Sequence, residues 1–131
     1  MLSFEGKISS GLQKAGQFME KEVYKKQYLD KLGFIPYHGT LNIKLSNNIT
    51  LNLDNLHDKL KRIHGNGSFG DVLFLEAYLS TIDEKITKKG AILFPVKTVY
   101  DTDTLEYVSS EKLRDTLNLK DGDKVIIKIE K

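Results

Sequence analysis

Short stretches of alternating hydrophobic and polar residues recur along the chain, which is the pattern of β-strands that bury one face. The clearest stretch runs over 40–45, where Leu41, Ile43 and Leu45 alternate with Asn42 and Lys44. The most apolar stretch, 69–79, predicts a central strand. Further strands are predicted over 2–8, 91–94, 105–108 and 125–129.

Helical spacing of apolar residues predicts a helix over 21–32 that ends at Gly33. A second, shorter helix is predicted from 111 to about 117, because Ser109 and Ser110 can accept hydrogen bonds from first-turn amides. Tight turns are predicted at 83–85 and 121–123. Six or so short strands, two short helices and no regular strand–helix alternation favour a closed or partly closed antiparallel barrel over a doubly wound sheet.

Composition adds the size and the class of the protein. The chain has 131 residues, 40% of them hydrophobic and 29% charged, so we expect one globular domain over 1–131. No apolar stretch is long enough to cross a bilayer, and the first residues lack the apolar core of a secretion signal. We therefore expect a soluble, cytoplasmic protein with no membrane partner. The absence of cysteine excludes disulfides, thiolate metal sites and a cysteine nucleophile.

The charge of the chain restricts how it can hold an anion. Its 20 basic and 18 acidic residues leave a net charge of +2, which does not predict nucleic-acid binding. Arginine occurs only at Arg62 and Arg114. A bidentate contact between a guanidinium and phosphate must therefore use one of these two residues. Otherwise lysines and backbone amides must bind the phosphate.

Two glycine-containing loops are candidates for phosphate binding. The segment 65–70 matches the dinucleotide fingerprint in its letters, but it does not follow a strand and open a helix, so a plain turn is the better reading. The loop 11–17 is the better candidate, since its glycines let backbone amides turn toward a ligand and Lys14 adds charge. A simple surface connection remains an alternative there. The sequence holds no Walker motif.

Candidate metal ligands occur where the segment 36–42 leads into a strand. Thr40 and Asn42 are two residues apart on that strand, so they face the same side. A hydroxyl and an amide oxygen on one face suit a hard cation that also holds phosphate oxygens. The alternative is a polar strand face that simply meets water. A histidine site is not expected, because His38, His57 and His64 lack metal-ligand spacing.

The segment Pro36-Tyr37-His38-Gly39-Thr40-Leu41-Asn42 resembles the Pro-Tyr-x-Gly-Thr-Leu-Asn signature of the archaeal CTP-dependent riboflavin kinases. Three further features follow the family's order: the early Ser10-Gly11-Leu12 loop, Pro95-x-Lys97-Thr98 followed by Glu106, and Lys112-Leu113-Arg114 leading to 119–123. The first loop departs from the family's usual Gly-Leu-Gly-Glu-Gly, since it reads Gly11-Leu12-Gln13-Lys14-Ala15-Gly16.

The resemblance implies a mainly β fold, a small six-stranded antiparallel barrel of the cradle-loop type with two short helices. It implies transfer of the γ-phosphate of CTP to the 5′-hydroxyl of riboflavin, giving FMN and CDP. Thr40 and Asn42 would hold Mg²⁺, and Thr98 and Glu106 would contact the flavin. The residues that would bind the cytidine nucleotide are Gly11, Leu12, Gln13, Lys14, Ala15, Gly16, Gln17, Glu111, Lys112, Leu113 and Arg114.

Several expectations accompany this reading. Glu106 is the best available carboxylate to take a proton from the attacking hydroxyl, although phosphoryl transfer through a loose transition state needs no strong base. The partners expected are riboflavin, FMN, CTP and CDP, with no nucleic acid, and the protein is expected to be a monomer. The alternative from another class is a non-enzymatic small barrel that binds nucleic acid or stores flavin.

Overall fold

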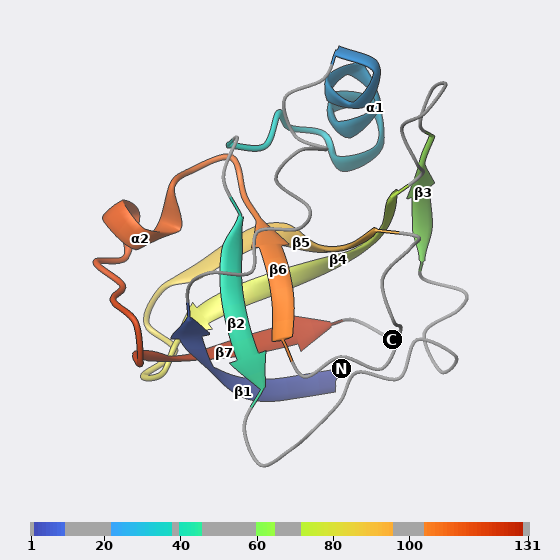
Figure 1. The fold of residues 1–131 in the computed structure, drawn as a ribbon. Coiled ribbons are helices and arrows are strands. Elements are labelled where there is room, and N and C mark those ends of the chain that lie inside the picture. Colours follow the sequence, from blue (N-terminus) through green and yellow to red (C-terminus); the bar gives the residue numbers. More distant parts are fainter. Residues whose placement is uncertain are drawn as a thin grey trace.

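A computed structural model of the chain describes residues 2–9, 22–37, 40–45, 60–64, 72–95 and 104–129 (Figure 1). Within these residues lie seven strands and two helices. In chain order they are β1 (Leu2–Ser9), α1 (Glu22–Leu32), β2 (Leu41–Leu45), β3 (Lys61–Ile63), β4 (Val72–Thr81), β5 (Thr87–Pro95), β6 (Thr104–Val108), α2 (Leu113–Thr116) and β7 (Lys124–Ile129). Neither of these helices is long and apolar enough to cross a membrane.

Six of the strands close into a ring. The sheet order is β3-β4-β5-β6-β2-β1-β7, and β7 also pairs with β4, which closes the ring and leaves β3 outside it. Every pairing in the ring is antiparallel. Closure depends on the length of β4, whose residues from Val72 to Ser80 pair with β5 while Tyr78 to Thr81 pair with β7. The expected mainly β fold, with six antiparallel strands in a closed arrangement and two short helices, is confirmed.

The inside of the ring is filled by the apolar half of each alternating strand. Leu41, Ile43 and Leu45 of β2 point inward, as the alternation predicts, and are buried. The large ring of Tyr107 crosses the interior, and its hydroxyl donates to the carbonyls of Ala77 and Lys88 at 2.9 and 3.1 Å. Tyr107 passes so close to Gly90 that a Cβ there would lie 2.6 Å from its ring.

A second core lies on the outside of the ring, between the sheet and α1. Tyr24, Tyr28 and Leu32 of the helix are buried, at the helical spacing that the sequence shows. They pack with outward-facing residues of four strands: Ile63, Val72, Phe74, Ala91, Leu93 and Val108. The outer face of β5 and β6 is therefore apolar where α1 covers it, and polar side chains begin beyond that cover.

Helix α1 also covers the open edge of β3, the strand outside the ring (Figure 1). The side-chain amide of Gln27 donates to the carbonyl of His64 and accepts from its amide, both at 2.7 Å, as a neighbouring strand would. The ammonium of Lys31 donates to the carbonyl of Arg62. These contacts satisfy backbone groups that an unpaired strand edge would expose.

Some element boundaries differ from the predictions. Helix α2 covers only Leu113–Thr116, and its N-cap residue is Lys112, which makes no side-chain capping bond. The predicted cap at Ser109 and Ser110 is wrong. The Ser109 hydroxyl accepts from the amide of Glu111, and Glu111 precedes the first residue of α2 by two positions. The three-residue strand β3 was not predicted, since so short a segment shows no periodicity.

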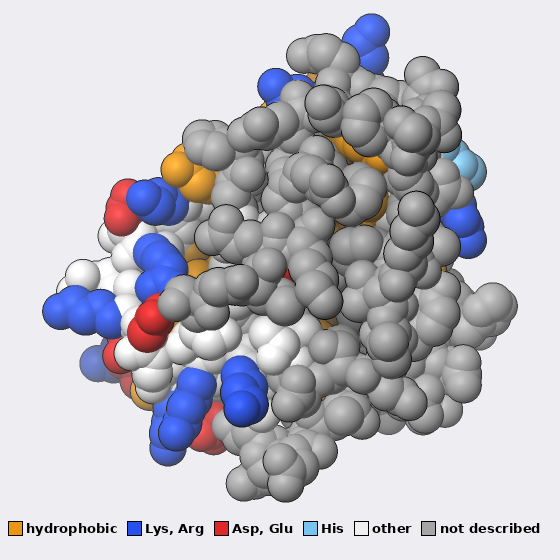
Figure 2. Space-filling view, viewed as in Figure 1, with side chains coloured by type: hydrophobic (Ala, Val, Ile, Leu, Met, Phe, Trp, Pro, Cys, Tyr) orange, Lys and Arg blue, Asp and Glu red, His pale blue; other side chains and the backbone are white. Residues whose placement is uncertain are grey.

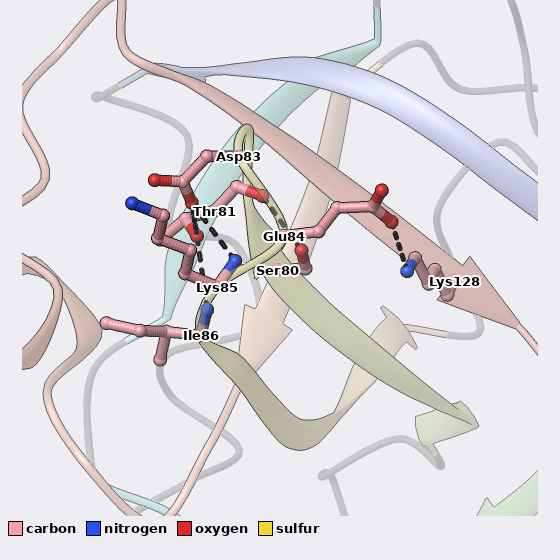
Figure 3. Close-up of polar contacts among 7 residues, drawn as sticks. All are labelled: Ser80, Thr81, Asp83, Glu84, Lys85, Ile86 and Lys128. Atoms are coloured by element: carbon pink, nitrogen blue, oxygen red, sulfur yellow. Dashed lines mark hydrogen bonds and ion pairs between the residues drawn. The ribbon is translucent and has the colours of Figure 1, made fainter.

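The predicted turn after β4 is confirmed, and side chains hold it (Figure 3). The Thr81 hydroxyl donates to Asp83 Oδ1 at 2.6 Å, and the Lys85 amide donates to the same oxygen at 3.1 Å. The hydrogen bond from Thr81 has the largest effect and that from Lys85 the next largest, and both hold the pKa of the Asp83 carboxyl below its usual value. Glu84 has φ 58 in this turn and forms an ion pair with Lys128 of β7, which ties the turn to the ring closure.

Candidate functional site

A row of outward-facing residues crosses four strands of the ring. Because paired residues of antiparallel strands point to the same face, the register places Ser9 of β1 opposite Asn42 of β2, and Asn42 opposite Glu106 of β6. Glu106 lies opposite Leu93 of β5, the residue at which the row enters the second core. Residues from four strands thus meet in one row.

Thr40 joins this row from the residue before β2. Its hydroxyl donates to Glu106 Oε1 at 3.2 Å, so Thr40 lies on the same face as Asn42. The prediction that Thr40 and Asn42 share a side is confirmed. The structure adds Glu106 as their neighbour across the strand pair, and this residue is 66 positions away from Thr40 in the chain.

The centre of the row is buried although it faces away from the interior of the ring, whereas Ser9 and Thr40 are half-buried. Asn42 is 2% exposed and Glu106 is 4% exposed. The Asn42 side-chain oxygen, Oδ1, is buried and has no hydrogen-bond partner among the described residues. An amide oxygen that is removed from water without a partner costs free energy, so this atom is suited to accept a ligand.

The donor set suits a hard cation. Because Thr40 donates its hydroxyl proton to Glu106, the lone pairs of its oxygen are left for another partner. Asn42 contributes a neutral amide oxygen beside it, and oxygen ligands of this kind bind Mg²⁺ or Ca²⁺. In the part of the chain that the structure describes, no group of three histidines, cysteines or acids could hold a metal ion.

The segment 109–114 lies beside this row. The Tyr37 amide donates to the carbonyl of Ser109 at 2.7 Å. This bond joins a residue shortly before β2 to a residue shortly before α2. Arg114 Nη2 donates to the carbonyl of Ser9 at 3.0 Å and to Asp121 Oδ1 at 2.7 Å. The end of β1, from which the predicted nucleotide loop 11–17 starts, is therefore held against the other predicted nucleotide segment.

The side chains of that second segment are largely engaged within the protein. Leu113 is 4% exposed and belongs to the interior core. Glu111 forms an ion pair with Lys88 at 3.1 Å. Lys112 lies 3.8 Å from Asp115 in a surface pair, and Arg114 is paired with Asp121. A ligand at this segment would meet backbone groups and the outer parts of these pairs.

Part of the predicted site lies outside the described residues. This concerns the loop 11–17, Thr98, His38 and His57, and also the glycine-rich segment 65–70. His64 lies at the edge of β3, where its backbone is bound by Gln27. Sequence reasoning missed Ser9, whose place in the row follows only from the β1–β2 register.

Comparison with known proteins gives one consistent result. A family model named CTP-dep_RFKase, described as a domain of unknown function, DUF120, matches residues 8–129. The chain is 99% identical over 131 residues to the riboflavin kinase of Methanosphaera stadtmanae, with both chains covered in full. It is 39% identical over 123 residues to that of Methanothermobacter thermautotrophicus, covering 94% of this chain and 95% of the relative.

A third relative is the riboflavin kinase of Methanobrevibacter smithii, which is 34% identical over 127 residues, covering 96% of this chain and 98% of the relative. The residues that the family model matches include Asn42, Glu106 and the segment 109–114. The range matched by the family model therefore includes the segments that carry the row of polar residues.

Proposed function

The chain belongs to the family of CTP-dependent riboflavin kinases, a family of phosphotransferases, and we propose that it transfers the γ-phosphate of CTP to the 5′-hydroxyl of riboflavin, giving FMN and CDP. One observation supports this site for the reaction. The buried Asn42 Oδ1 has no described partner, and it lies on the same strand face as the Thr40 hydroxyl, which Glu106 orients. Phosphoryl transfer needs positioned groups and charge compensation more than covalent participation by the protein.

Mg²⁺ fits the oxygens of Thr40 and Asn42. Both are neutral oxygen ligands, and burial makes the unpartnered amide oxygen favourable for a cation. When bound, the ion compensates the charge of the phosphate oxygens. The hydrogen bond from Thr40 to Glu106 fixes which way the threonine oxygen presents its lone pairs, so Glu106 orients one of the two ligands.

We propose that Glu106 also acts on riboflavin, the substrate that accepts the phosphate. A carboxylate has two oxygens, and Oε1 accepts from Thr40. We propose that Glu106 also accepts a hydrogen bond from riboflavin, together with Thr98, and that it takes the proton of the attacking hydroxyl. Its burial between β2 and β5 supports this role, because bulk water does not compete there for the carboxylate.

The cytidine nucleotide is proposed to bind between 11–17 and 111–114. Support comes from Arg114, which donates to the carbonyl of Ser9 and so holds the end of β1, the strand that precedes 11–17 in the chain, beside 111–114. Backbone groups there can bind a pyrimidine base without many arginines. One domain over 1–131, a monomer, a cytoplasmic location and the absence of nucleic-acid partners remain predictions from the sequence.

The function is tested by comparing nucleotides. Purified protein is incubated with riboflavin, Mg²⁺ and each of CTP, ATP, GTP and UTP, and FMN is separated from riboflavin by chromatography. We expect FMN with CTP and little with the other three. Absence of FMN with every nucleotide contradicts the proposal. Equal, nucleotide-independent affinity for riboflavin and FMN in that case would indicate flavin storage.

A further inference from the structure

Three lysines stand directly opposite one another on neighbouring strands. The register pairs Lys44 of β2 with Lys7 of β1, and pairs Lys7 with Lys124 of β7. All three are exposed. Like charges directly opposite each other in a sheet are destabilising. Such a row, here called the lysine strip (Lys7, Lys44 and Lys124), costs stability unless an anion compensates it.

Little of this charge is compensated within the protein. Lys124 lies 3.7 Å from Glu5 in an exposed pair. Across the described ranges, neither Lys7 nor Lys44 has a carboxylate within ion-pair distance. Figure 2 shows basic side chains next to one another on the lower part of this face, where Figure 1 has β1 and β2.

The lysine strip borders the proposed metal site. Lys44 follows Asn42 by two residues on β2, and Lys7 precedes Ser9 by two residues on β1, so all four side chains leave the same face. Two residues along a strand span about 7 Å. The ammonium groups of Lys7 and Lys44 are therefore the nearest cations along these two strands to the row of Ser9 and Asn42.

Three other described cations near the site are already paired. Arg114 is bound to Asp121, Lys112 lies beside Asp115, and Lys88 is bound to Glu111. A nucleoside triphosphate carries several negative charges, and one divalent cation balances only part of them. The remaining charge needs cations without a carboxylate of their own, and Lys7 and Lys44 meet that requirement.

We propose that the lysine strip binds the phosphate chain of the nucleotide, with Lys7 and Lys44 as its main contacts. This inference rests on the proposed function for the identity of the anion as a nucleoside triphosphate. It assigns the phosphate end of the nucleotide to β1 and β2, whereas the segments 11–17 and 111–114 hold its cytidine end. Repulsion between the lysines in the unliganded protein is relieved when the phosphates bind.

The test is CTP binding to the Lys7→Gln/Lys44→Gln double variant, measured by calorimetry with Mg²⁺ and without riboflavin. We expect affinity about tenfold weaker than in the parent, since exposed charge contacts contribute modestly and there are two of them. The loss of affinity with rising salt should be less steep than in the parent. Thermal stability without nucleotide should stay equal or rise, because the repulsion is removed.

Two control variants distinguish the lysine strip from net charge. Lys26→Gln/Lys61→Gln removes the same charge from exposed positions on α1 and β3 and should bind CTP as the parent does. Lys7→Arg/Lys44→Arg keeps both charges and should do the same. Parent-like CTP affinity and salt dependence in Lys7→Gln/Lys44→Gln would overturn the inference.

Failure of this inference is distinguishable from failure of the proposed function. A parent protein that binds CTP through the lysine strip but forms no FMN contradicts the proposed kinase activity alone. A parent that forms FMN while the double glutamine variant binds CTP normally contradicts the lysine strip alone. A parent that binds no CTP overturns both.

Discussion

At the scale of single residues, the site depends on one buried oxygen without a described hydrogen-bond partner and on one hydrogen bond between side chains. Asn42 Oδ1 is buried without a described partner, and the Thr40 hydroxyl donates to Glu106. The sequence could predict that Thr40 and Asn42 share a face, because strand alternation is local. It could not predict the bond to Glu106, which depends on the β2–β6 register and joins residues 66 positions apart.

Asn42→Ala should abolish metal-dependent FMN formation at low Mg²⁺ while leaving the fold intact. The removed oxygen makes no hydrogen bond to a described residue, so the free energy of unfolding should fall only by about 1–2 kcal/mol, for the cavity that the shorter side chain leaves. Activity across a Mg²⁺ titration and urea unfolding measure the two effects. Asn42→Asp keeps an oxygen ligand and should retain more activity. A fully active Asn42→Ala would remove the metal assignment.

Two glycines differ in the reason for their presence. A Cβ at Gly90 would lie 2.1 Å from the carbonyl oxygen of Val108, whereas a Cβ at Gly33 meets nothing within 4 Å but sits at φ +82. We expect Gly90→Ala to destabilise the protein by about 3 kcal/mol through overpacking. Gly33→Ala should cost about 1 kcal/mol, from backbone strain alone. Urea unfolding of both variants checks the order, and equal losses would contradict the close approach.

At the scale of elements, α1 serves both as a cover for the second core and as a substitute neighbour for β3. Its buried face was predictable from the spacing of Tyr24, Tyr28 and Leu32. Its second role was not, because Gln27 and Lys31 look like ordinary surface residues in the sequence and bind backbone atoms more than 30 positions away. The short helix α2 was predicted too long for a similar reason, since local capping signals were read without the contacts that set its start.

Gln27→Ala should loosen the edge of β3 and leave the ring unaffected. The variant loses both bonds to the His64 backbone, so the amide of His64 should exchange with deuterium faster while amides of β4 and β5 keep their protection. The overall loss of stability should be about 1 kcal/mol. Lys26→Ala, on the exposed side of the same helix, is the matched control. Unchanged exchange at His64 would contradict the edge-covering role.

At the scale of the whole molecule, two cores lie on the two sides of one sheet. Alternation along the strands predicted the interior core. The outer core depends on where α1 docks, and sequence periodicity does not contain that information. The closing pair β4–β7 was also beyond prediction, because it requires one long strand to pair with two partners at overlapping positions. The polar row of the site lies where the outer core ends.

Both cores contain a buried tyrosine, and this predicts alkaline unfolding. Burial raises the pKa of Tyr28 and of Tyr107 well above the usual value of 10.0. Above pH 10 the unfolded chain therefore loses protons that the folded chain keeps, so stability falls as the pH rises. Absorbance titration at 295 nm should show these two of the six tyrosines ionising only together with unfolding.

Tyr107→Phe isolates one of the two contributions. It removes the interior hydroxyl and its bonds to Ala77 and Lys88, so its stability at neutral pH should be lower. The further loss between pH 9 and pH 11 should be smaller than in the parent, since one tyrosine fewer is protected. Gradual ionisation of all tyrosines in the folded parent would contradict the burial of both.

The ring brings the first and last strands into register, with Leu2 opposite Ile129. A short peptide joining these two ends would need to cross only one strand spacing, of about 5 Å. Circular permutation is tolerated where termini are close and the new opening lies in an exposed turn. A permutant reopened at the turn of Asp83 and Glu84 would keep all six pairings of the ring. Its new ends would lie about 40 positions along the chain from the proposed metal ligands Thr40 and Asn42, which makes that turn a suitable position for attaching a fluorescent reporter.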